Sequence, residues 1–339
     1  MLHAAILAYD GCYLSILSGY ADLLHVANAH LSMHQTSQEQ RFTWTLVSLT
    51  GDAITACNGL QVKTQKINLS EEFDVVFIPS AFYAGGKSFK KLLNEQKNFC
   101  AWLTHQWNSG AYLVSSCTGT FILAETGLLN GKSGTTTWWL ADQFRARYPN
   151  VNLQLDSVIT EHDKLICAGA SASYLIQAIQ IIESLVGPTI ASQCAKTLLI
   201  DTSQTKQTPY IPFLADRTHA DSLVHKAQHL LQKKFKTDIK ISTLSSDLRV
   251  SERTLIRRFH QALKQSPLSY LQGLRIGSAQ DLLKEGDLSI ESIAALVGYA
   301  DTSSFSRLFK KKIGTSPGTY RNQFRSLPAQ PLTDTSCRV

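Results

Sequence analysis

The sequence contains no run of about 20 uncharged apolar residues, the length that a membrane-spanning helix requires. Its N-terminus also lacks the pattern of a secretory signal peptide. The seven cysteines form no CxxC pair and no paired spacing, which argues against a disulfide framework and against a structural zinc site. We therefore expect a soluble cytoplasmic protein with reduced thiols, without a metal or a cofactor and without a membrane partner.

Positive charge is concentrated in the last third of the chain. Residues 221–325 contain 18 Lys and Arg against 9 Asp and Glu, whereas the other residues contain 15 against 17. An excess of one sign in one segment predicts a polyanionic partner for that segment. A basic surface without a partner is the alternative, and composition alone leaves it open.

The same basic segment contains an internal repeat with an offset of fifty residues. Residues 251–275 align without a gap on residues 301–325, and six of the twenty-five positions are identical. The identical pairs are Arg257 and Arg307, Phe259 and Phe309, Ser266 and Ser316, Pro267 and Pro317, Tyr270 and Tyr320, and Arg275 and Arg325. Each copy follows a short helical pattern and a break, then opens a helix with a basic outer face. This arrangement is typical of a tandem helix-turn-helix DNA reader.

In the first copy, residues 243–248 predict a short helix, and Ser251 is a good N-cap for the helix that follows. Spacing predicts that the core face of this second helix consists of Leu255, Phe259 and Leu263. Another face carries Arg253, Ile256, Arg257 and His260. Because arginine can bridge two acceptors on a guanine edge or contact phosphate, this face is a candidate reader of the major groove.

The second copy repeats this arrangement. Gly298 is expected to end its short helix, and Asp301 is expected to cap the next one. The apolar stripe of the short helix consists of Ile290, Ile293, Ala294 and Val297, and the inward face of the next helix of Phe305, Phe309 and Ile313. The outward face consists of Ser303, Ser306, Arg307 and Lys310, while Lys311 and Lys312 extend the positive charge toward the DNA backbone.

One helix over residues 267–284 is predicted to join the two copies. Its length of about 27 Å would place two reading helices in successive major-groove segments, which lie about 34 Å apart. A generic helical bundle with a basic solvated face is the alternative.

The stretch IAALVGYADTSSFSRLFKKKIGTSPGTYR at residues 293–321 resembles the second helix-turn-helix signature of the AraC/XylS transcriptional regulators. The resemblance extends over residues 218–325. It implies base-reading positions at Arg253, Ile256 and Arg257 in the first copy, and at Ser303, Ser304, Ser306 and Arg307 in the second. Lys264 stands where the family has a glycine before the first Ser-Pro pair, whereas Gly314 keeps that glycine in the second copy. This departure concerns the geometry of the first turn.

Residues 1–187 alternate strand-like and helix-like stretches. Strands are predicted at 3–8, 43–49, 74–79 and 111–115, and helices at 120–126 and 173–185. This alternation predicts a doubly wound, flavodoxin-like α/β sandwich, followed by an all-α domain with two helix-turn-helix units. In the α/β fold, the ligand site lies at the carboxyl ends of the strands.

Cys117 stands at a strand-to-helix junction in this domain. A sharp turn there would lift its side chain above the sheet, and the following helix N-terminus would lower the pKa of its thiol. The sequence SSCTG resembles the nucleophile elbow of PfpI-type, class I glutamine amidotransferase-like domains. With AETGLLNG at 124–131 and TTTW at 135–138, nearly the whole chain resembles the GlxA-type regulators, which join such a domain to an AraC-type one.

A nucleophilic cysteine needs a base within hydrogen-bond reach. Catalytic relatives place a histidine directly after the cysteine, where this chain has Thr118, and many of the regulators place one where it has Thr137. His105 and His162 are more distant candidates. We therefore predict a catalytically inactive domain, with a cysteine-dependent hydrolase or lyase and a thiol redox sensor as alternatives.

The elbow is better interpreted as part of a ligand pocket, in which the amides of Cys117 and Thr118 would hold a carboxylate. The candidate ligand-binding residues are Cys117, Thr118, Gly119, Trp138, Phe82 and Asp22, with Tyr83 and Trp139 as further walls. The resemblance implies a small amine or amino acid as effector, which suits a cation–π wall. For each aromatic residue the alternative is a place in the core, and for Asp22 it is a solvated position on a helix.

The expected domains are a ligand-sensing domain at 1–195, a linker at 196–217, a DNA-binding domain at 218–325 and a mobile tail at 326–339. The resemblance implies a sequence-specific transcriptional regulator, an activator, that responds to a small metabolite. Its expected partners are double-stranded promoter DNA, the small-molecule effector, RNA polymerase and a second copy of the chain, which would pack on residues 173–186. A constitutive DNA-binding protein whose first domain only dimerises is the alternative.

Overall fold

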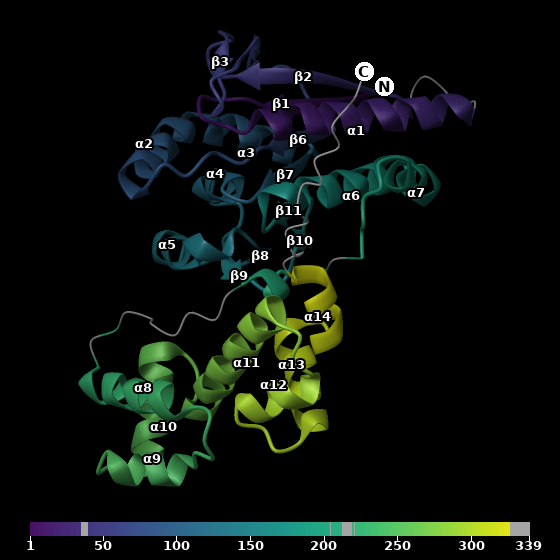
Figure 1. Ribbon diagram of the computed structural model, residues 1–339. Helices are drawn as coiled ribbons and strands as arrows, with labels where there is room; N and C mark the ends of the chain where they lie inside the picture. Colours follow the sequence, from purple (N-terminus) through teal and green to yellow (C-terminus); the bar gives the residue numbers. More distant parts are fainter. Residues whose placement is uncertain (35–39, 204, 212–218, 220, 326–339) are drawn as a thin grey trace, which may run out of the picture. The chain divides into compact units, whose positions relative to one another are not determined.

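The computed structural model describes residues 1–34, 40–203, 205–211, 219 and 221–325. It divides into two compact units, and the boundary lies between Gln207 and Thr208. Each unit is described by itself (Figure 1). The predicted tail at 326–339 and part of the predicted linker lie outside the described residues. Within the described ranges, no helix combines the length and the apolar character needed to cross a membrane.

A sheet of seven strands among the described residues forms the centre of the first unit. The order of its strands is β10-β11-β7-β6-β1-β2-β5, and all neighbours are parallel except β10 and β11. Their bounds are β1 Leu2–Leu7, β2 Phe42–Ser48, β5 Gln65–Lys66, β6 Val75–Ile78, β7 Tyr112–Ser116, β10 Ile159–His162 and β11 Leu165–Ala168. Two small pairs complete the strands: β3 Ile54–Thr55 with β4 Gln61–Val62, and β8 Ser133–Gly134 with β9 Asn152–Leu153. The predicted doubly wound α/β fold is confirmed.

Helices cover both faces of this sheet. The chain leaves β1 toward β2 on one side and later crosses from β6 to β7 in the opposite direction. Because such crossovers are right-handed, their helices α1 and α3 lie on opposite faces. The helices are α1 Leu14–Met33, α2 Gly86–Gln96, α3 Cys100–Asn108, α4 Gly119–Glu125, α5 Ala141–Arg147, α6 Tyr174–Val186 and α7 Pro188–Thr197. Helices α6 and α7 pack against α1 (Figure 1).

Buried polar contacts fix α1 and α6 above the sheet. Tyr20 of α1 stacks on Phe77 of β6 with ring centroids 4.1 Å apart, and its hydroxyl donates a 3.0 Å hydrogen bond to Gln177 of α6. The amide of Gln177 donates in turn to the backbone carbonyls of Ser115 and Ile166, each at 3.0 Å. These contacts tie both helices to β7 and β11.

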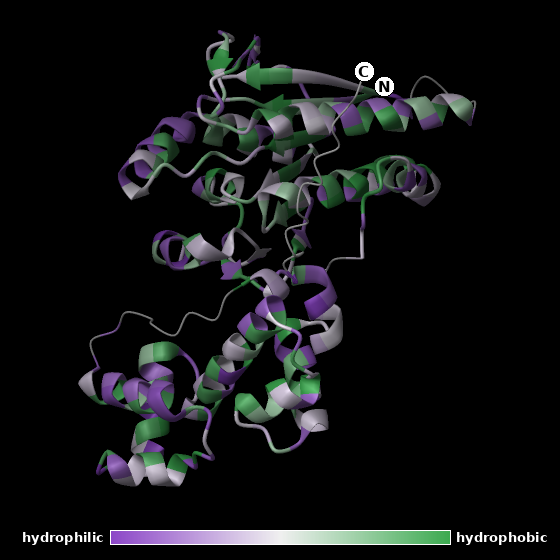
Figure 2. Ribbon diagram, viewed as in Figure 1, coloured by the Kyte–Doolittle hydropathy of each residue, from purple (hydrophilic) through white to green (hydrophobic). Residues whose placement is uncertain are grey.

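The second unit is helical. Its helices are α8 Ser222–Lys234, α9 Ile241–Asp247, α10 Glu252–Leu263, α11 Pro267–Glu285, α12 Ile290–Leu296, α13 Thr302–Ile313 and α14 Pro317–Phe324. Apolar and polar residues alternate along them (Figure 2). Helix α11 contributes Tyr270 and Leu271 to one apolar core and Ile276 and Leu283 to a second. The predicted joining helix at 267–284 is therefore confirmed, and it is shared by two cores.

Candidate functional site

The first candidate reading helix is α10. The hydroxyl of Ser251 accepts a 3.2 Å hydrogen bond from the amide of Thr254, so the predicted cap is confirmed. The predicted core residues are buried: Leu255, Phe259 and Leu263. The four predicted reading residues are exposed: Arg253, Ile256, Arg257 and His260.

The second candidate reading helix, α13, has the same arrangement. The carboxylate of Asp301 accepts from the amides of Ser303 at 3.2 Å and Ser304 at 2.7 Å, which confirms the predicted cap. The inward residues are buried: Phe305, Phe309 and Ile313. The outward residues Ser303, Ser304, Arg307 and Lys310 are exposed and Ser306 is half-buried. Arg307 donates to the hydroxyl of Ser304 at 3.4 Å, which directs the guanidinium along the N-terminal part of the helix.

Lys312 does not extend this basic face as predicted. Its ammonium group donates a 3.3 Å hydrogen bond to the hydroxyl of Ser269 on α11. Burial, together with the neighbouring charge of Lys311, lowers the pKa of Lys312. Lys312 therefore packs within the unit, while Lys311 stays exposed.

The turn that contains Lys264 keeps the expected geometry. Lys264 adopts a left-handed conformation with φ 56°, and its amide donates to the carbonyl of His260 at 3.0 Å. Gly314 has φ 95° and makes the corresponding bond to Lys310 at 2.8 Å. The first copy therefore forms the same helix end without glycine, at the steric cost of a side chain in the left-handed region.

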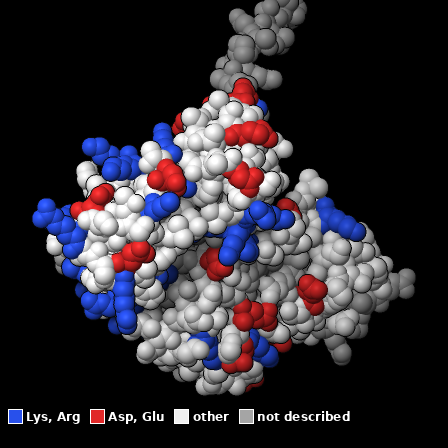
Figure 3. Space-filling view, turned by 90° about the horizontal axis from the view of Figure 1, so that it is seen from below, with Lys and Arg blue, Asp and Glu red and all other residues white. Residues whose placement is uncertain are grey.

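Positive side chains accompany the first reading helix. On the face of the molecule shown in Figure 3, Lys and Arg side chains gather along the left. Helices α8, α9 and α10 lie on this side in Figure 1. Exposed basic residues on and between these helices include Lys233, Lys240, Arg253 and Arg257. Such a surface favours a polyanion such as the DNA backbone.

Arg275 of α11 joins the two helix-turn-helix copies, a role that the sequence reasoning missed. Its guanidinium donates to the carbonyls of Phe235 and Thr237, both at 2.8 Å, and lies 5.1 Å from the ring centroid of Tyr299. Gly298 lets this turn approach closely, because a Cβ there would lie 2.8 Å from the carbonyl oxygen of Lys236. The loop after α8 is thus held against the turn of the second copy.

In the first unit, Cys117 occupies the sharp turn that was predicted after β7. Its φ is 51°, in the left-handed region. Its amide donates to the carbonyl of Ala168 at 2.7 Å, and its carbonyl accepts from the Thr136 hydroxyl at 2.7 Å. The turn also needs Gly119, since a Cβ there would lie 2.6 Å from the carbonyl oxygens of Ile78 and Pro79. Because the Cys117 amide is already bonded, it does not hold a carboxylate as we expected.

The thiol of Cys117 differs from expectation as well. Its side chain is buried, and burial raises its pKa, although nearby polar groups that include Ser171, Thr137 and Ser80 partly oppose this shift. The predicted lowering by the helix N-terminus is wrong because desolvation of the thiolate outweighs it. The thiol is therefore protonated at neutral pH.

The other predicted ligand residues divide between this turn and the surrounding surface. The Thr118 hydroxyl accepts from the amide of Ala81 at 2.8 Å and donates to its carbonyl at 2.9 Å, so it fastens the loop after β6. Next to Ala81, Phe82 is 54% exposed and meets the ring of Tyr13 edge-on at 6.3 Å. Trp138 is half-buried, and Trp139 is 49% exposed with its ring 5.6 Å from that of Trp138.

Two further candidates and two histidines lie elsewhere. Asp22 is exposed on α1, and its charge adds to the effect of burial in raising the pKa of Tyr174. The hydroxyl of Tyr83 accepts a 3.1 Å hydrogen bond from the side-chain amide of Gln143. His162 ends β10 opposite Leu165, which begins β11, whereas Cys117 is bonded to Ala168 at the other end of that strand. His105 lies on α3, which leads into the starting end of β7. Both histidines therefore belong to the edge of the sheet opposite Cys117.

The surroundings of Cys117 include residues that the sequence reasoning did not select. Tyr9 and Tyr13 follow β1, and Ser80 follows β6. Burial raises the pKa of both tyrosines, and the nearby Cys117 adds to this shift. Parallel strands place their carboxyl ends at one edge, and the strand order reverses at β1. Residues that follow β1 and β6 were therefore predictable neighbours of a residue that follows β7.

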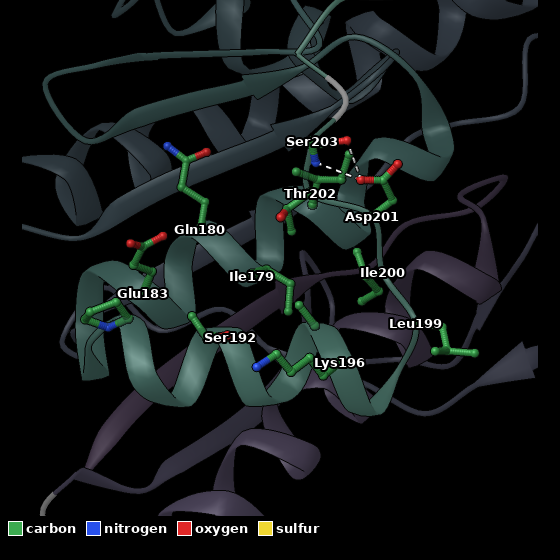
Figure 4. A pocket seen from close by; sticks show the side chains of 14 residues that line it. Ile179, Gln180, Glu183, Ser192, Lys196, Leu199, Ile200, Asp201, Thr202 and Ser203 are labelled. Carbon is green, nitrogen blue, oxygen red and sulfur yellow. Dashed lines mark hydrogen bonds between the residues drawn. The ribbon is translucent and has the colours of Figure 1, made fainter. Parts of the chain in front are cut away.

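Two cavities lie away from this turn. A groove of about 840 Å³ runs between α6, α7 and residues 199–203, and Figure 4 shows Gln180, Glu183 and Lys196 among the side chains that line it. In the same wall, Asp201 accepts from the amide and the hydroxyl of Ser203 at 2.9 and 2.6 Å. A smaller cavity of about 430 Å³ lies between α2, α4 and α5. Neither is lined by Cys117 or by the predicted aromatic walls.

Comparison with known proteins covers both units. A helix-turn-helix domain model matches residues 244–323, and the DJ-1/PfpI family model matches residues 30–182. The HTH-type transcriptional regulator CdhR of Pseudomonas aeruginosa is 25% identical over 283 residues, which cover 83% of this chain and 82% of that protein. The HTH-type transcriptional regulator GbdR of the same species is 23% identical over 313 residues, covering 92% and 82%.

A crystal structure of a protein from Vibrio parahaemolyticus has a similar fold, with a TM-score of 0.50 and 18% identity over 58% of this chain and 98% of that one. The sequence relatives named above are transcriptional regulators, as expected for a chain that is not an enzyme. Two capped helices of the same design and an α/β sheet with a Cys117 turn accompany these matches. The chain thus combines a segment that the DJ-1/PfpI family model matches with a segment that a helix-turn-helix domain model matches, and over most of its length it is similar to HTH-type transcriptional regulators.

Proposed function

We propose that the chain reads a promoter sequence by placing α10 and α13 in successive segments of the major groove. The observation that carries this proposal is the equivalence of Arg257 and Arg307. Both are exposed at the sixth residue of a capped helix of 12 residues whose opposite face is buried. The connecting helix of 19 residues is about 28 Å long, close to the 34 Å between groove segments on one face of the duplex.

The exposed residues divide into two roles. Arg253, Arg257 and Arg307 read base edges, for which guanine offers two acceptors to one guanidinium. Ile256, His260 and the serines at 303, 304 and 306 supply apolar and hydroxyl contacts on the same faces. Lys310 and Lys311 contact phosphate, which adds affinity without choice of sequence.

Selection of duplexes from a random pool, with the full chain as bait at about 150 mM salt, tests this reading. We expect enrichment of sequences with two conserved blocks one helical turn apart. Arg257→Ala should relax the choice in one block and Arg307→Ala in the other. Lys311→Ala is the matched control, which should weaken binding to all sequences and reduce the salt dependence. A pool that stays random after repeated selection contradicts the proposal.

We further propose that a small amine or amino acid binds at the edge of the sheet beside Cys117. Aromatic side chains remain accessible near this edge, among them Phe82 and Trp139. Their rings suit a cationic ligand. In this site Cys117, Thr118 and Gly119 shape the loop, because their polar groups are engaged or closely packed, and the aromatic residues contact the ligand.

A thermal-shift screen of the full chain with amines and amino acids tests the effector site. A compound that raises Tm should lose its effect in Trp138→Ala and Phe82→Ala, whereas Trp44→Ala on β2 is the control and should retain it. A ligand that stabilises all three variants equally would place the site elsewhere, for example in the groove between α6 and α7.

We also propose that the chain works in the cytoplasm as a homodimeric activator that contacts RNA polymerase, as family resemblance suggests. In vitro transcription from a selected duplex should rise with the chain present, and light scattering should give twice the chain mass. A cysteine-dependent hydrolase, lyase or redox sensor is disfavoured, because the Cys117 thiol is buried and protonated and both histidine candidates belong to the opposite edge of the sheet.

A further inference from the structure

The end of the first unit is fastened to segments that also bind the Cys117 turn. The side chain of Gln207 is buried, and its amide nitrogen donates to the hydroxyl of Thr135 at 3.0 Å and to the carbonyl of Ser157 at 2.8 Å. Its backbone amide donates to the carbonyl of Asp156 at 2.9 Å. Gly169 makes room for it, since a Cβ there would lie 1.7 Å from that amide nitrogen.

The segments that hold Gln207 also hold Cys117. Thr136, next to Thr135, donates its hydroxyl to the carbonyl of Cys117 at 2.7 Å. Ala168, next to Gly169, accepts from the amide of Cys117 at 2.7 Å. A rearrangement of the Cys117 turn must therefore move one or both segments against which Gln207 is packed.

The beginning of the second unit is fastened to the second reading helix. The hydroxyl of Thr208 donates a 2.6 Å hydrogen bond to the carbonyl of Ile313, the last residue of α13. This carbonyl belongs to the last turn, whose acceptors lack partners within the helix. Tyr210 accepts from Gln323 of α14 at 2.8 Å and meets the ring of Phe324 at 5.0 Å.

The predicted linker is therefore partly structured on both sides of one peptide bond. Residues 205–207 pair with residues 156–158 through two backbone hydrogen bonds. The amide of Val158 donates to the carbonyl of Thr205 at 3.0 Å, and the amide of Gln207 donates to the carbonyl of Asp156 at 2.9 Å. The residues at 208–210 form a 3-10 turn that belongs to the second unit. Gln207 and Thr208 share one peptide bond, so a displacement of the Gln207 carbonyl also moves the amide of Thr208.

We propose that Gln207 and Thr208 form the transmission element between the Cys117 site and α13. This inference rests on the proposed function, because it assigns the regulation of the same site. Occupation of the site displaces segments 135–136 and 168–169, Gln207 moves with them, and Thr208 alters the end of α13. By thermodynamic reciprocity, DNA bound at α13 must also alter the Cys117 loop.

Hydrogen exchange of the full chain, with and without a 40-bp duplex selected from a random pool, tests this without knowledge of the effector. In the wild type we expect the duplex to slow exchange in α10 and α13 and to change exchange in residues 133–137 at least two-fold. The change in exchange at residues 133–137 should be lost in Gln207→Ala and in Gly169→Ala, whose added methyl group displaces the Gln207 side chain. In both variants the duplex should still protect α10. Thr208→Val should lose the change at residues 133–137 as well.

Ser203→Ala, an exposed change in the same connecting segment, is the matched control and should behave as the wild type. If the change at 133–137 persists in Gln207→Ala and Thr208→Val, or is absent from a wild type whose α10 and α13 are protected, the transmission element is refuted. Absence of any protection of α10 and α13 would instead refute the proposed DNA reading.

Discussion

Gln280 of α11 donates a 3.1 Å hydrogen bond to the hydroxyl of Tyr320 on α14, and Gln232 of α8 makes the same bond of 2.9 Å to Tyr270 on α11. The two pairs occupy corresponding places in the two copies. Helix α11 is therefore the last helix of the first copy and the first helix of the second. Because the copies share a helix, the spacing of α10 and α13 is set by one rigid element.

Lys264→Gly should stabilise the second unit by about 0.5–1 kcal/mol, since it removes a side chain from a left-handed conformation. Lys264 is exposed, so few contacts are lost. Thermal unfolding should show a higher Tm. The reciprocal change at the equivalent position, Gly314→Ala, should lower it, and a rise in both variants would contradict the steric explanation.

Stability of the second unit should depend on the charge of Asp221. Arg258 makes a bidentate pair with this carboxylate, with N–O distances of 2.6 and 2.7 Å. The pair holds the pKa of Asp221 below about 3.9, the usual value for an aspartate. The stabilisation of the fold by the Asp221 charge is therefore present above about pH 3.9 and is lost as the pH falls through the lower pKa of Asp221 in the folded state. Asp221→Asn should lower stability by about 1–2 kcal/mol at pH 7, with the difference shrinking below pH 4.

Asp281→Asn is the control for this pH dependence, because its pair with Lys284 is largely exposed and contributes little. Chemical denaturation at pH 7 and at pH 3 measures both variants. An effect of Asp221→Asn that is the same at both pH values would show that the carboxylate acts by packing and not by charge.

The elbow should not tolerate a side chain at residue 119. Gly119→Ala places a Cβ 2.6 Å from two backbone oxygens, so the backbone must shift, at a cost of about 1–3 kcal/mol. Gly86→Ala is the control in the same unit, because its nearest neighbour, the Tyr83 hydroxyl, would lie at 3.6 Å. Equal Tm values for the two variants in the full chain would mean that the loop after β6 moves freely.

The Cys117 thiol should react slowly. It is buried and its pKa is raised by burial, whereas Cys57 is exposed. With iodoacetamide at pH 8, peptide mass spectrometry should show alkylation of Cys57 at least ten-fold faster. Cys117 reacting first would revive the hypothesis of a reactive cysteine.

Local signals explain why much of the fold was predictable. The strands at 42–48 and 112–116 lie within one residue of their predicted positions, because buried parallel strands are short apolar runs. Ser251 and Asp301 were identified as caps because a cap acts on amides two or three residues away. Core and outward faces of α10 and α13 followed from helical periodicity.

Long-range contacts explain what the sequence did not reveal. The pKa of Cys117 depends on its burial and on Ser171 and Ser80, and only the tertiary structure brings these surroundings to it. Gln207 is buried because Gly169 leaves space for it, and Lys312 turns inward because Ser269 accepts from it. A polar side chain carries no local signal for such partners, so these three features became visible only in the tertiary structure.

The most direct test of DNA reading is competition between a selected 40-bp duplex and a scrambled duplex of the same composition, at about 150 mM salt. We predict that the wild type prefers the selected duplex by at least 10³-fold and that Arg257→Ala and Arg307→Ala each reduce this preference by about 1–3 kcal/mol. Equal binding of the two duplexes by the wild type, or a preference unchanged in both variants, would contradict reading by α10 and α13.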